Sequence, residues 1–208
     1  MIELFTADTP NGKKISIMLE EIKFNYKTTK INIFKDEQFT PEFKKISPFS
    51  KIPVIKDHKN NNSLFESGAI LIYLSEQSGK FYDQDKRTII NQWLMGQVAY
   101  IGPMLGQHHQ FHHYNPGKSE FAEERYLKIC TRIYKELDER LAEVDYLAGN
   151  FYSIADIATF PWIARHEWHD IGLKNYKNLT RWYKLISKRE AVQRGYDLLE
   201  KSEKIPSA

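Results

Sequence analysis

Three residues near the start of the chain have side chains and spacing that suit the stabilisation of a negatively charged atom. Thr9, Pro10 and Asn11 stand just before a segment whose apolar residues have helical spacing. A hydroxyl and a side-chain amide placed there, with the positive end of a helix dipole behind them, can stabilise a thiolate or another anion. The alternative is an ordinary N-cap followed by a turn, which the residue types alone favour.

A second candidate is the pair Glu66-Ser67, which stands at a predicted helix start. The free backbone N–H groups at such a start can bind a ligand carboxylate, and the Glu66 side chain can bind a ligand ammonium beside it. Together these groups would suit the head group of an amino acid. Taken alone, the pair is also explained by simple capping with an acid that the helix dipole favours.

The third candidate is Ile52-Pro53, at the start of a short apolar run. A proline there suits the edge or a bent entrance of a strand, because it cannot donate to the sheet. If the peptide bond is cis, the N–H and C=O of Ile52 can pair with an extended peptide-like ligand. The trans form is the commoner one, so the pair alone favours an ordinary strand start.

The histidines offer a possible metal site. Four of them have the i, i+4 spacing that can bind Zn²⁺ on a helix, but no further ligand is evident nearby and the Asn115-Pro116-Gly117 breaker follows. We therefore expect a polar helix end or the wall of a cleft, and no metal. The four residues are His108, His109, His112 and His113.

The remaining candidates for chemistry are His166, His169 and Cys130. The two histidines are expected at the surface or at an interface. Cys130 is the only cysteine, which excludes an internal disulfide framework and a Cys-x-x-Cys motif. Because it lies within an amphipathic helical pattern, we expect a small buried thiol and not a nucleophile.

The first eighty residues contain the elements that must position these groups. Short apolar or alternating runs predict strands and 3.6-residue periodicity predicts helices, in the order β-α-β-α-β-β-α. Ser67 is expected to begin the last of these helices and Gly79 to end it. The predicted elements are strands at 2–5, 26–33, 52–55 and 63–65, and helices near 15–22, from 41, and from 67.

The rest of the chain is predicted to be all helical. Long helical patterns cover residues 84–110 and 119–144, and Ser153 with Asp156 forms a capping box before a further helix. A boundary is expected between Phe81 and Asp85, without a long linker. This divides the chain into residues 1–80 and 86–208.

Composition narrows the class of protein. The chain has 208 residues and a net charge of +3, which is too mild for a nucleic-acid-binding face. Its apolar runs fall well short of the roughly 20 residues of a membrane span, and the N-terminus lacks the layout of a signal peptide. We expect a soluble cytoplasmic protein that binds neither nucleic acid nor membrane.

The order of these motifs resembles the cytosolic glutathione transferase family over essentially the whole chain. It is most similar to Nu-class members, the bacterial disulfide-bond oxidoreductases related to the globular domain of the yeast nitrogen regulator. The Gly102–Gln107 run is the most diagnostic segment. The segments that carry the resemblance are Thr9–Ile15, Gln38–Phe43, Ile46–Pro53, Glu66–Ile70, Gly102–Gln107, Glu124–Tyr126 and Tyr152–Ala158.

The resemblance implies a fold and a ligand. Residues 1–80 would form a thioredoxin-like glutathione-binding domain of class α+β with a mixed four-stranded sheet. Residues 86–208 would form an all-α domain for the acceptor site and dimerisation. The co-substrate would be glutathione, with no metal, and the partner would be a second copy of the chain.

The resemblance also implies roles for particular residues. Thr9 and Asn11 would face the glutathione sulfur as the catalytic groups. Glutathione would be bound by Gln38, Lys51, Ile52, Pro53, Glu66, Ser67, Gln92 and Arg125. In this arrangement Glu66 and Ser67 hold the γ-glutamyl head, Ile52 pairs with the cysteinyl backbone beside a cis Pro53, and Lys51 and Gln38 lie near the glycyl carboxylate.

One departure from ordinary glutathione transferases shapes the predicted reaction. The Thr9–Asn11 loop holds no cysteine, tyrosine or serine, so the sulfur must come from glutathione. We therefore predict a glutathione-dependent disulfide-bond reductase that acts on a small disulfide. Conjugation of glutathione to an electrophile is the first alternative, and a non-catalytic glutathione- or partner-binding regulatory domain is the second.

Overall fold

The computed structural model describes residues 1–199 and 201–208. The chain forms two compact units, each described separately below. Unit 1 holds Met1–Asp83 and Arg189–Lys204, and unit 2 holds Gln84–Lys188 and Ile205–Ala208. The segment Arg189–Lys204, which the sequence assigned to the helical half, therefore packs with the N-terminal half. The prediction that 1–80 and 86–208 are separate domains stays a prediction.

Unit 1 is built on a mixed four-stranded sheet with the strand order β2-β1-β3-β4. β1 pairs parallel with β2 and antiparallel with β3, and β3 pairs antiparallel with β4. The predicted β-α-β-α-β-β-α order is confirmed, although the second strand ends at Lys30 and not at Ile33. The strands are β1 (Ile2–Thr6), β2 (Tyr26–Lys30), β3 (Val54–Asp57) and β4 (Asn62–Phe65).

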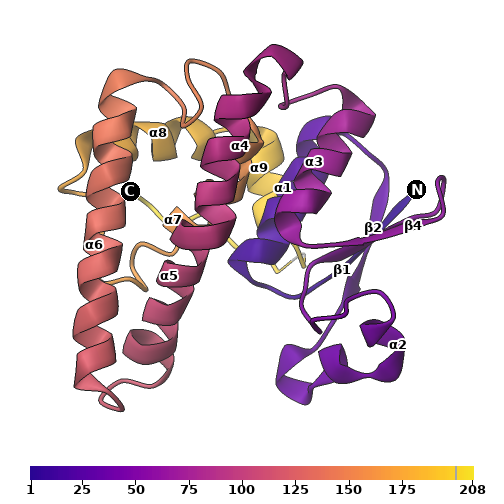
Figure 1. The fold of residues 1–208 in the computed structure, drawn as a ribbon, viewed down its shortest axis with the longest axis horizontal. Helices are drawn as coiled ribbons and strands as arrows, with labels where there is room; N and C mark the ends of the chain where they lie inside the picture. Colours follow the sequence, from indigo (N-terminus) through magenta and orange to yellow (C-terminus); the bar gives the residue numbers. More distant parts are fainter. Residues whose placement is uncertain (200) are drawn as a thin grey trace. The chain divides into compact units, whose positions relative to one another are not determined.

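Two helices of unit 1, α1 (Pro10–Ile22) and α3 (Ser67–Ser78), lie side by side against this sheet (Figure 1). The short α2 (Pro41–Lys44) connects β2 to β3. Thr9 caps α1, and Pro10 occupies its first turn, where the missing N–H is not needed. Both helices therefore begin where a loop leaves the sheet, and these starts carry two of the predicted sites.

The helix α9 (Glu190–Tyr196) packs against α1 at very close range. The Oγ atom of Ser16 donates a hydrogen bond to the carbonyl oxygen of Gly195 at 2.5 Å. A Cβ atom built on Gly195 would lie 2.5 Å from the Cα atom of Ile17 and 2.6 Å from its nitrogen. The two backbones can approach this closely only because residue 195 has no side chain.

We expect Gly195→Ala to lower the free energy of unfolding by roughly 3 kcal/mol, because the added methyl group meets backbone atoms that cannot move aside. The matched control is Gly96→Ala, also in a helix, where an added Cβ meets no atom within 4 Å. That control should be neutral or gain up to about 1 kcal/mol from helix propensity. Urea denaturation of both variants measures the difference, and equal stabilities would contradict the close packing of α9.

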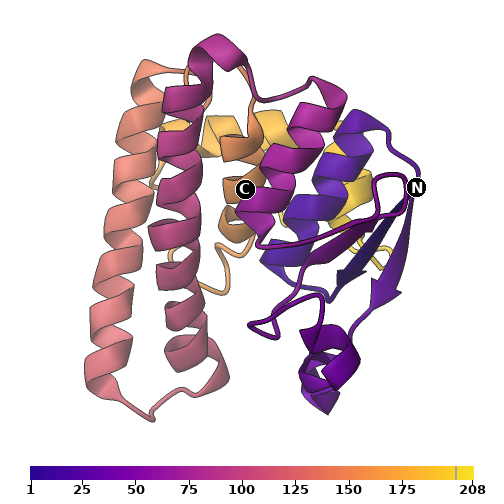
Figure 2. The same cartoon turned by 45° about the vertical axis from the view of Figure 1, so that its right-hand side comes forward.

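Unit 2 is built of helices, with one isolated β-bridge between Tyr146 and Gly149. A nearly continuous helical rod is formed by α4 (Arg87–Gly96), the π-helical turn η4 (Gln97–Ile101), α5 (Gly102–His108) and the π-helical turn η5 (His109–Tyr114). The long α6 (Glu120–Glu143) runs beside this rod (Figure 2). α7 (Ile154–Ile163) is buried along its whole length and contacts α4, α5 and α8 (Lys177–Ser187).

The predicted capping box at the start of α7 is present. The Asp156 carboxylate accepts hydrogen bonds from the Ser153 N–H at 3.0 Å and from the Ser153 hydroxyl at 3.1 Å. It also accepts the Leu147 N–H and the indole N–H of Trp182, each at 2.9 Å. Burial nevertheless raises the pKa of Asp156 to about 6, against the effect of these hydrogen bonds.

The diagnostic Gly102–Gln107 run has a packing explanation in unit 2. Cβ atoms built on Gly102 and Gly106 would each lie 3.2 Å from the indole ring of Trp162 on α7. The two glycines are four residues apart, so both lie on the face of α5 that meets this ring. The run therefore lets a large aromatic side chain pack directly against a helix backbone.

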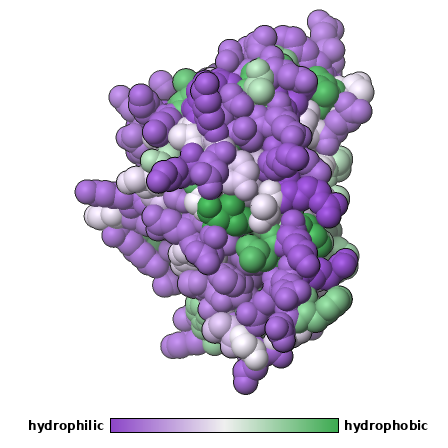
Figure 3. Space-filling view, turned by 90° about the vertical axis from the view of Figure 1, so that its left-hand side faces the viewer, coloured by the Kyte–Doolittle hydropathy of each residue, from purple (hydrophilic) through white to green (hydrophobic). Residues whose placement is uncertain are grey.

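The surface is mainly hydrophilic on the side where α6 and α8 lie in Figure 1, with small apolar areas (Figure 3). Among residues 1–199 and 201–208, no helix combines the length and apolar character needed to cross a membrane.

Candidate functional site

A cavity of about 180 Å³ in unit 1 brings together most of the residues predicted to bind a ligand. It lies where the start of α1, the entrance to β3, the end of β4 and the start of α3 meet. Each of these four chain segments adjoins a strand of the sheet or a helix that packs on it. The lining residues are Asn11, Ser47, Lys51, Ile52, Pro53, Phe65, Glu66 and Ser67.

Of the two predicted sulfur contacts, Asn11 lines this cavity and Thr9 does not. The Thr9 hydroxyl oxygen accepts a hydrogen bond from the Gly12 N–H at 3.1 Å and so caps α1. The capping alternative is therefore correct for Thr9. Asn11, on the first turn of α1, presents an amide beside the positive end of the helix dipole, where it can donate to an anion.

The Glu66-Ser67 pair combines an acidic residue with the first residue of a helix. Glu66 is exposed, whereas Ser67, the first residue of α3, is buried. Glu66 has a φ of 66°, in the left-handed region, and its side chain does not cap α3. A non-glycine residue in this conformation costs of order 1–3 kcal/mol, and such residues are concentrated at binding sites.

Lys14, which is not among the predicted site residues, lies next to this pair. Its side chain on α1 is buried, and its Nζ atom donates a hydrogen bond to the Ser67 Oγ atom at 3.3 Å. Burial lowers the pKa of Lys14 to about 7, and the negative charge of Glu66 opposes this shift. The site therefore carries a buried amine whose protonation depends on the charges around it.

The Ile52–Pro53 peptide bond is cis. The loop before it is fixed by Ser47, whose hydroxyl donates to the Lys51 carbonyl oxygen at 2.8 Å and accepts the Lys51 N–H at 3.0 Å. Within the described residues, Ile52 forms no backbone–backbone hydrogen bond. Its N–H and C=O are thus available to a peptide-like ligand in the cavity.

Three other predicted residues do not line this cavity. Gln38 lies on a short turn of 3₁₀ helix, where its side-chain amide donates to the carbonyl oxygen of Ile33 at 3.3 Å. Gln92 and Arg125 are exposed residues of α4 and α6 in unit 2. Gln92 lines a different, mostly apolar cavity of about 380 Å³ with Trp93 and Leu137 among its neighbours. The roles of these three residues stay predictions.

The prediction that His166 and His169 lie at the surface or at an interface is wrong. Both are buried, and so are His108 and His109. His169 stacks on His109 with 4.6 Å between ring centroids, and its Nδ1 atom is 2.7 Å from the Tyr134 hydroxyl. Its carbonyl oxygen is 2.9 Å from the Nε2 atom of His108. These histidines belong to the packed aromatic interior of unit 2, where His109 and His169 stack face to face and His166 meets the Tyr183 ring edge-on.

The buried histidines predict loss of stability in acid. Burial lowers the pKa of His109 to about 3 and holds that of His169 well below its usual value of 6.5. The unfolded chain therefore binds more protons below about pH 6.5, and the stability present above that pH is lost as the pH falls. At about pH 5.5, each histidine that stays neutral in the folded chain lowers the free energy of unfolding by about 1.4 kcal/mol.

We accordingly expect the free energy of unfolding to fall by roughly 3 kcal/mol from about pH 7.5 to about pH 5.5. His109→Phe should flatten this dependence, because a phenyl ring can stack on His169 and does not take up a proton. His58→Gln is the control, since His58 is half exposed and paired with Glu3. Urea titrations at the two pH values measure the difference; equal slopes for His109→Phe and the native chain would contradict the prediction.

The described residues contain no group of three or more His, Cys, Asp or Glu side chains that could hold a metal ion. Cys130 is buried, as predicted, and burial raises the pKa of its thiol to about 12. A thiol with that pKa is protonated at neutral pH and is not a nucleophile. Any reactive sulfur at the cavity of unit 1 must therefore arrive with a ligand.

Comparison with known proteins places this site in a family. Residues 2–76 match the glutathione S-transferase N-terminal domain, and residues 99–190 match the C-terminal domain. The chain is 44% identical to the disulfide-bond oxidoreductase YfcG of Escherichia coli K12, covering 92% of this chain and 93% of YfcG. It is 29% identical to the transcriptional regulator URE2 of Saccharomyces cerevisiae, covering 88% of this chain and 64% of the regulator.

A solved structure gives the same result. A glutathione transferase from Burkholderia graminis, with two glutathione molecules bound per subunit, aligns with a TM-score of 0.89 and 36% identity. The alignment covers 96% of this chain and 89% of that protein. The predicted thioredoxin-like half with a helical half after it is thus confirmed as the glutathione transferase fold. The chain belongs to the glutathione S-transferase family, with Nu-class bacterial disulfide-bond oxidoreductases and Ure2-like proteins among its relatives.

Proposed function

We propose that the protein is a glutathione-dependent disulfide-bond reductase. The observation that carries this proposal is the cavity of unit 1, whose lining includes Asn11 together with Glu66 and Ser67. Neither the cavity nor the Thr9–Asn11 loop contains a cysteine. The name of the Escherichia coli relative supports this reading, and the glutathione bound in the Burkholderia structure supports the ligand.

Each end of glutathione has a partner of suitable chemistry in this site. The Glu66 carboxylate binds the γ-glutamyl ammonium, and the Ser67 hydroxyl with the N–H groups of α3 binds the γ-glutamyl carboxylate. The backbone of Ile52 pairs with the cysteinyl residue next to Pro53. The Lys51 ammonium, with Gln38 nearby, attracts the glycyl carboxylate.

The Asn11 amide then donates a hydrogen bond to the sulfur, with Thr9 holding the helix start on which Asn11 stands. A free thiol has a pKa of about 8.5 and is mostly protonated at neutral pH. Lowering that pKa by one unit requires about 1.4 kcal/mol of differential stabilisation of the thiolate. One charge-assisted hydrogen bond and the dipole of α1 can supply this amount.

The reaction consists of two thiol–disulfide exchanges. The bound glutathione thiolate attacks one sulfur of a small disulfide, so that a mixed disulfide forms and the other half leaves as a thiolate. A second glutathione thiolate attacks the mixed disulfide and releases the second half as a thiolate, leaving glutathione disulfide. Two electrons pass from two glutathiones to the substrate, and the released thiolates take up protons from solvent.

The proposal also assigns roles to two residues of unit 2, a location in the cell and an oligomeric state. Gln92 and Arg125 contribute to glutathione binding, and the protein is a cytoplasmic homodimer. Size-exclusion chromatography with light scattering measures the oligomeric state, and a monomer at micromolar concentration would contradict the dimer. Variants Gln92→Ala and Arg125→Ala measure the two side-chain contributions to the dissociation constant of glutathione.

The test of the function is a direct comparison of substrates. Purified protein is assayed with glutathione and a model disulfide such as 2-hydroxyethyl disulfide, and in parallel with an aryl halide. We expect faster turnover of the disulfide. Faster turnover of the aryl halide would favour conjugation, which uses the same thiolate. Glutathione binding without turnover of either substrate would favour a regulatory role, which the resemblance to the URE2 regulator makes the second candidate.

A further inference from the structure

The residue next to Lys14, Lys13, stands at the centre of a buried charge network in unit 1 that the reaction described above does not use. Its side chain has no exposed surface. The Nζ atom donates to the Tyr196 carbonyl oxygen and to the Glu203 Oε2 atom, both at 2.6 Å, and it lies 3.0 Å from the Asp8 Oδ1 atom. It also lies 4.1 Å from the centroid of the Tyr196 ring. The Tyr196 and Glu203 oxygens accept hydrogen bonds from the ammonium, and the Asp8 carboxylate forms an ion pair with it.

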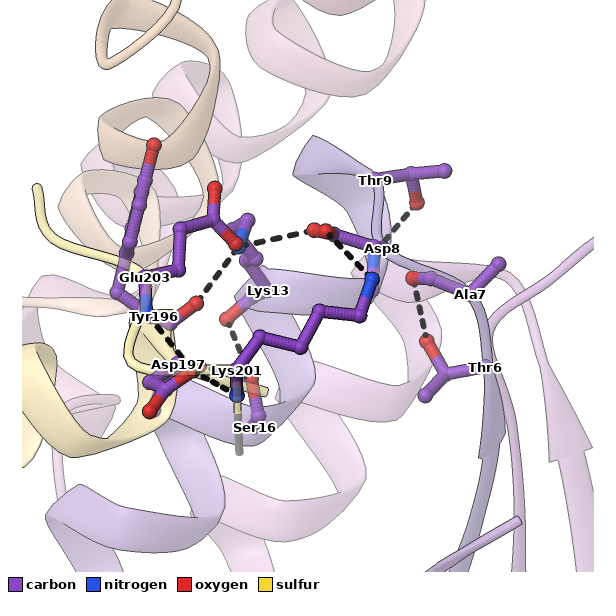
Figure 4. A network of polar contacts seen from close by, with 12 residues as sticks. Thr6, Ala7, Asp8, Thr9, Lys13, Ser16, Tyr196, Asp197, Lys201 and Glu203 are labelled. Carbon is purple, nitrogen blue, oxygen red and sulfur yellow. Dashed lines mark hydrogen bonds and ion pairs between the residues drawn. The ribbon is translucent and has the colours of Figure 1, made fainter. Parts of the chain in front are cut away.

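The network joins two segments that are far apart in the sequence (Figure 4). Asp8 immediately precedes Thr9, the N-cap of α1, and its other carboxylate oxygen lies 3.6 Å from the Nζ atom of Lys201. Tyr196 is the last residue of α9, and Glu203 lies in the C-terminal segment that follows this helix. With two lysines and two carboxylates, the formal charges of the network cancel.

Hydrogen bonds within the C-terminal segment hold Glu203 near Lys13. The Asp197 carboxylate accepts hydrogen bonds from the backbone N–H groups of Lys201, Ser202 and Glu203 at 2.8, 3.0 and 3.1 Å. These bonds turn the chain back toward α1 just after α9, which is itself seated on α1 through Gly195. Glu203 thus reaches Lys13 from an anchored turn.

The loop on the other side of Lys13 is equally constrained. A Cβ atom built on Gly12 would lie 2.4 Å from the Thr6 Oγ1 atom and 2.5 Å from the Ala7 carbonyl oxygen. The segment between β1 and α1 therefore lies directly against the first turn of the helix that carries Asn11. A movement of Asp8 is transmitted to Thr9 and the start of α1, since no space separates them.

From this arrangement we propose that Lys13 is a positioning residue for the thiol site, and that Glu203 and Tyr196 of the C-terminal segment complete its set of ligands. The inference rests on the proposed function, because it assumes that Asn11 contacts the glutathione sulfur. Lys13 does not line the cavity. It acts through Asp8, by holding the Thr9–Gly12 turn in the geometry in which the Asn11 amide meets the sulfur.

The test compares Glu203→Gln and Lys13→Met with a matched control, Glu21→Gln. Glu21 pairs with Arg189 at 2.5 Å, which also ties the C-terminal segment to α1, but near the opposite end of that helix. Glu203→Gln keeps the shape and an acceptor oxygen while removing the charge, and its side chain is only partly buried. If Lys13→Met does not fold, Glu203→Gln still tests the proposal.

The first measurement is amide hydrogen exchange in the free protein. We expect the amides from Thr9 to Gly12, apart from Pro10, to exchange at least about threefold faster in Glu203→Gln and Lys13→Met, and at the native rate in Glu21→Gln. The second measurement is the pH midpoint of thiolate absorbance near 240 nm for bound glutathione. It should rise by at least about half a pH unit in the two network variants, with glutathione affinity changed less than about threefold.

Native exchange rates and a native thiolate midpoint in both network variants would overturn the proposal. The same shifts in Glu21→Gln would also overturn it, because they would show a general loosening of the C-terminal segment. Failure of the proposed function is distinguished by the native protein alone, as an absence of glutathione binding or of disulfide turnover. In that case the exchange rates at Thr9–Gly12 still decide whether Lys13 and Glu203 hold the loop.

Discussion

Asn11→Ala is expected to reduce the rate of disulfide reduction by about 10- to 100-fold while the affinity for glutathione changes little. Asn11 is the side chain of α1's first turn that lines the cavity of unit 1. A hydrogen bond to a charged sulfur stabilises it by about 1.5–3 kcal/mol, and this stabilisation exists only when the thiol is ionised. The proposed peptide anchors Glu66, Ser67 and Ile52 remain in place, so binding of the tripeptide should persist.

The sign of the effect is checked with a second variant, Asn11→Asp. A carboxylate has nearly the same shape but repels the thiolate, so the pH midpoint of thiolate formation should move above that of Asn11→Ala. Steady-state assays with a fixed disulfide and varied glutathione separate the turnover rate from the Michaelis constant. Unchanged turnover in Asn11→Ala would mean that another group, such as a backbone amide, stabilises the sulfur.

Local signals in the sequence predicted the parts of the structure that depend on neighbours in the chain. Ser153 and Asp156 form the expected capping box because both partners lie within one helical turn. The helix predicted over 119–144 is also present as α6, and Ser119 caps its start. The helix from 84 to 110 was also correct in outline, although the chain continues helically to Tyr114 through two π-helical turns.

The candidate site could be predicted only in part. Asn11, Lys51, Ile52, Pro53, Glu66 and Ser67 were found because each belongs to a short motif, and all six line one cavity. The motif did not reveal that the Thr9 hydroxyl would accept a hydrogen bond from the Gly12 N–H, and its predicted contact with the sulfur stays a prediction. That hydrogen bond depends on the exact conformation of the loop, which the residue types do not determine.

Lys14 and Lys13 show why buried charges were missed. Their partners, Ser67 for Lys14 and Glu203 for Lys13, are distant in sequence, so no local spacing connects them. One signal was nevertheless present, since Lys14 stands four residues before Met18 and thus on the apolar stripe of α1. A lysine on such a stripe should be read as a buried cation that needs partners.

The histidines were misplaced for a related reason. Helical spacing showed that His108 and His112 share a face, but not that His108 on this face meets His169 from another segment. Histidine is intermediate in its tendency to be buried, so the residue type alone does not decide between surface and interior. The three-dimensional packing of aromatic rings around His109 decides it.

Glu66→Gln is expected to weaken glutathione binding by about 10- to 100-fold, because the amide cannot offer the γ-glutamyl ammonium a charged acceptor. Gln keeps the length and the unusual backbone conformation of residue 66, so the change isolates charge. The variant also removes the carboxylate that opposes the lowering of the Lys14 pKa, already at about 7. Lys14 should then be neutral at neutral pH, and the γ-glutamyl carboxylate near Ser67 loses a nearby cation.

In the proposed site Glu66 and Lys14 act on opposite ends of the same head group and on each other, so their effects should not add. Isothermal titration calorimetry of Glu66→Gln, Lys14→Met and the double variant gives the coupling, and we expect the double variant to bind within about threefold of Glu66→Gln. In the native chain, glutathione affinity should fall as the pH rises through about 7 and Lys14 loses its proton, and Lys14→Met should remove that fall. Two results would contradict this prediction: losses of binding free energy that are strictly additive, or a pH dependence of glutathione affinity that is unchanged in Lys14→Met. Either would show that Lys14 does not contribute to binding of the γ-glutamyl head and that Glu66 binds the ammonium without it.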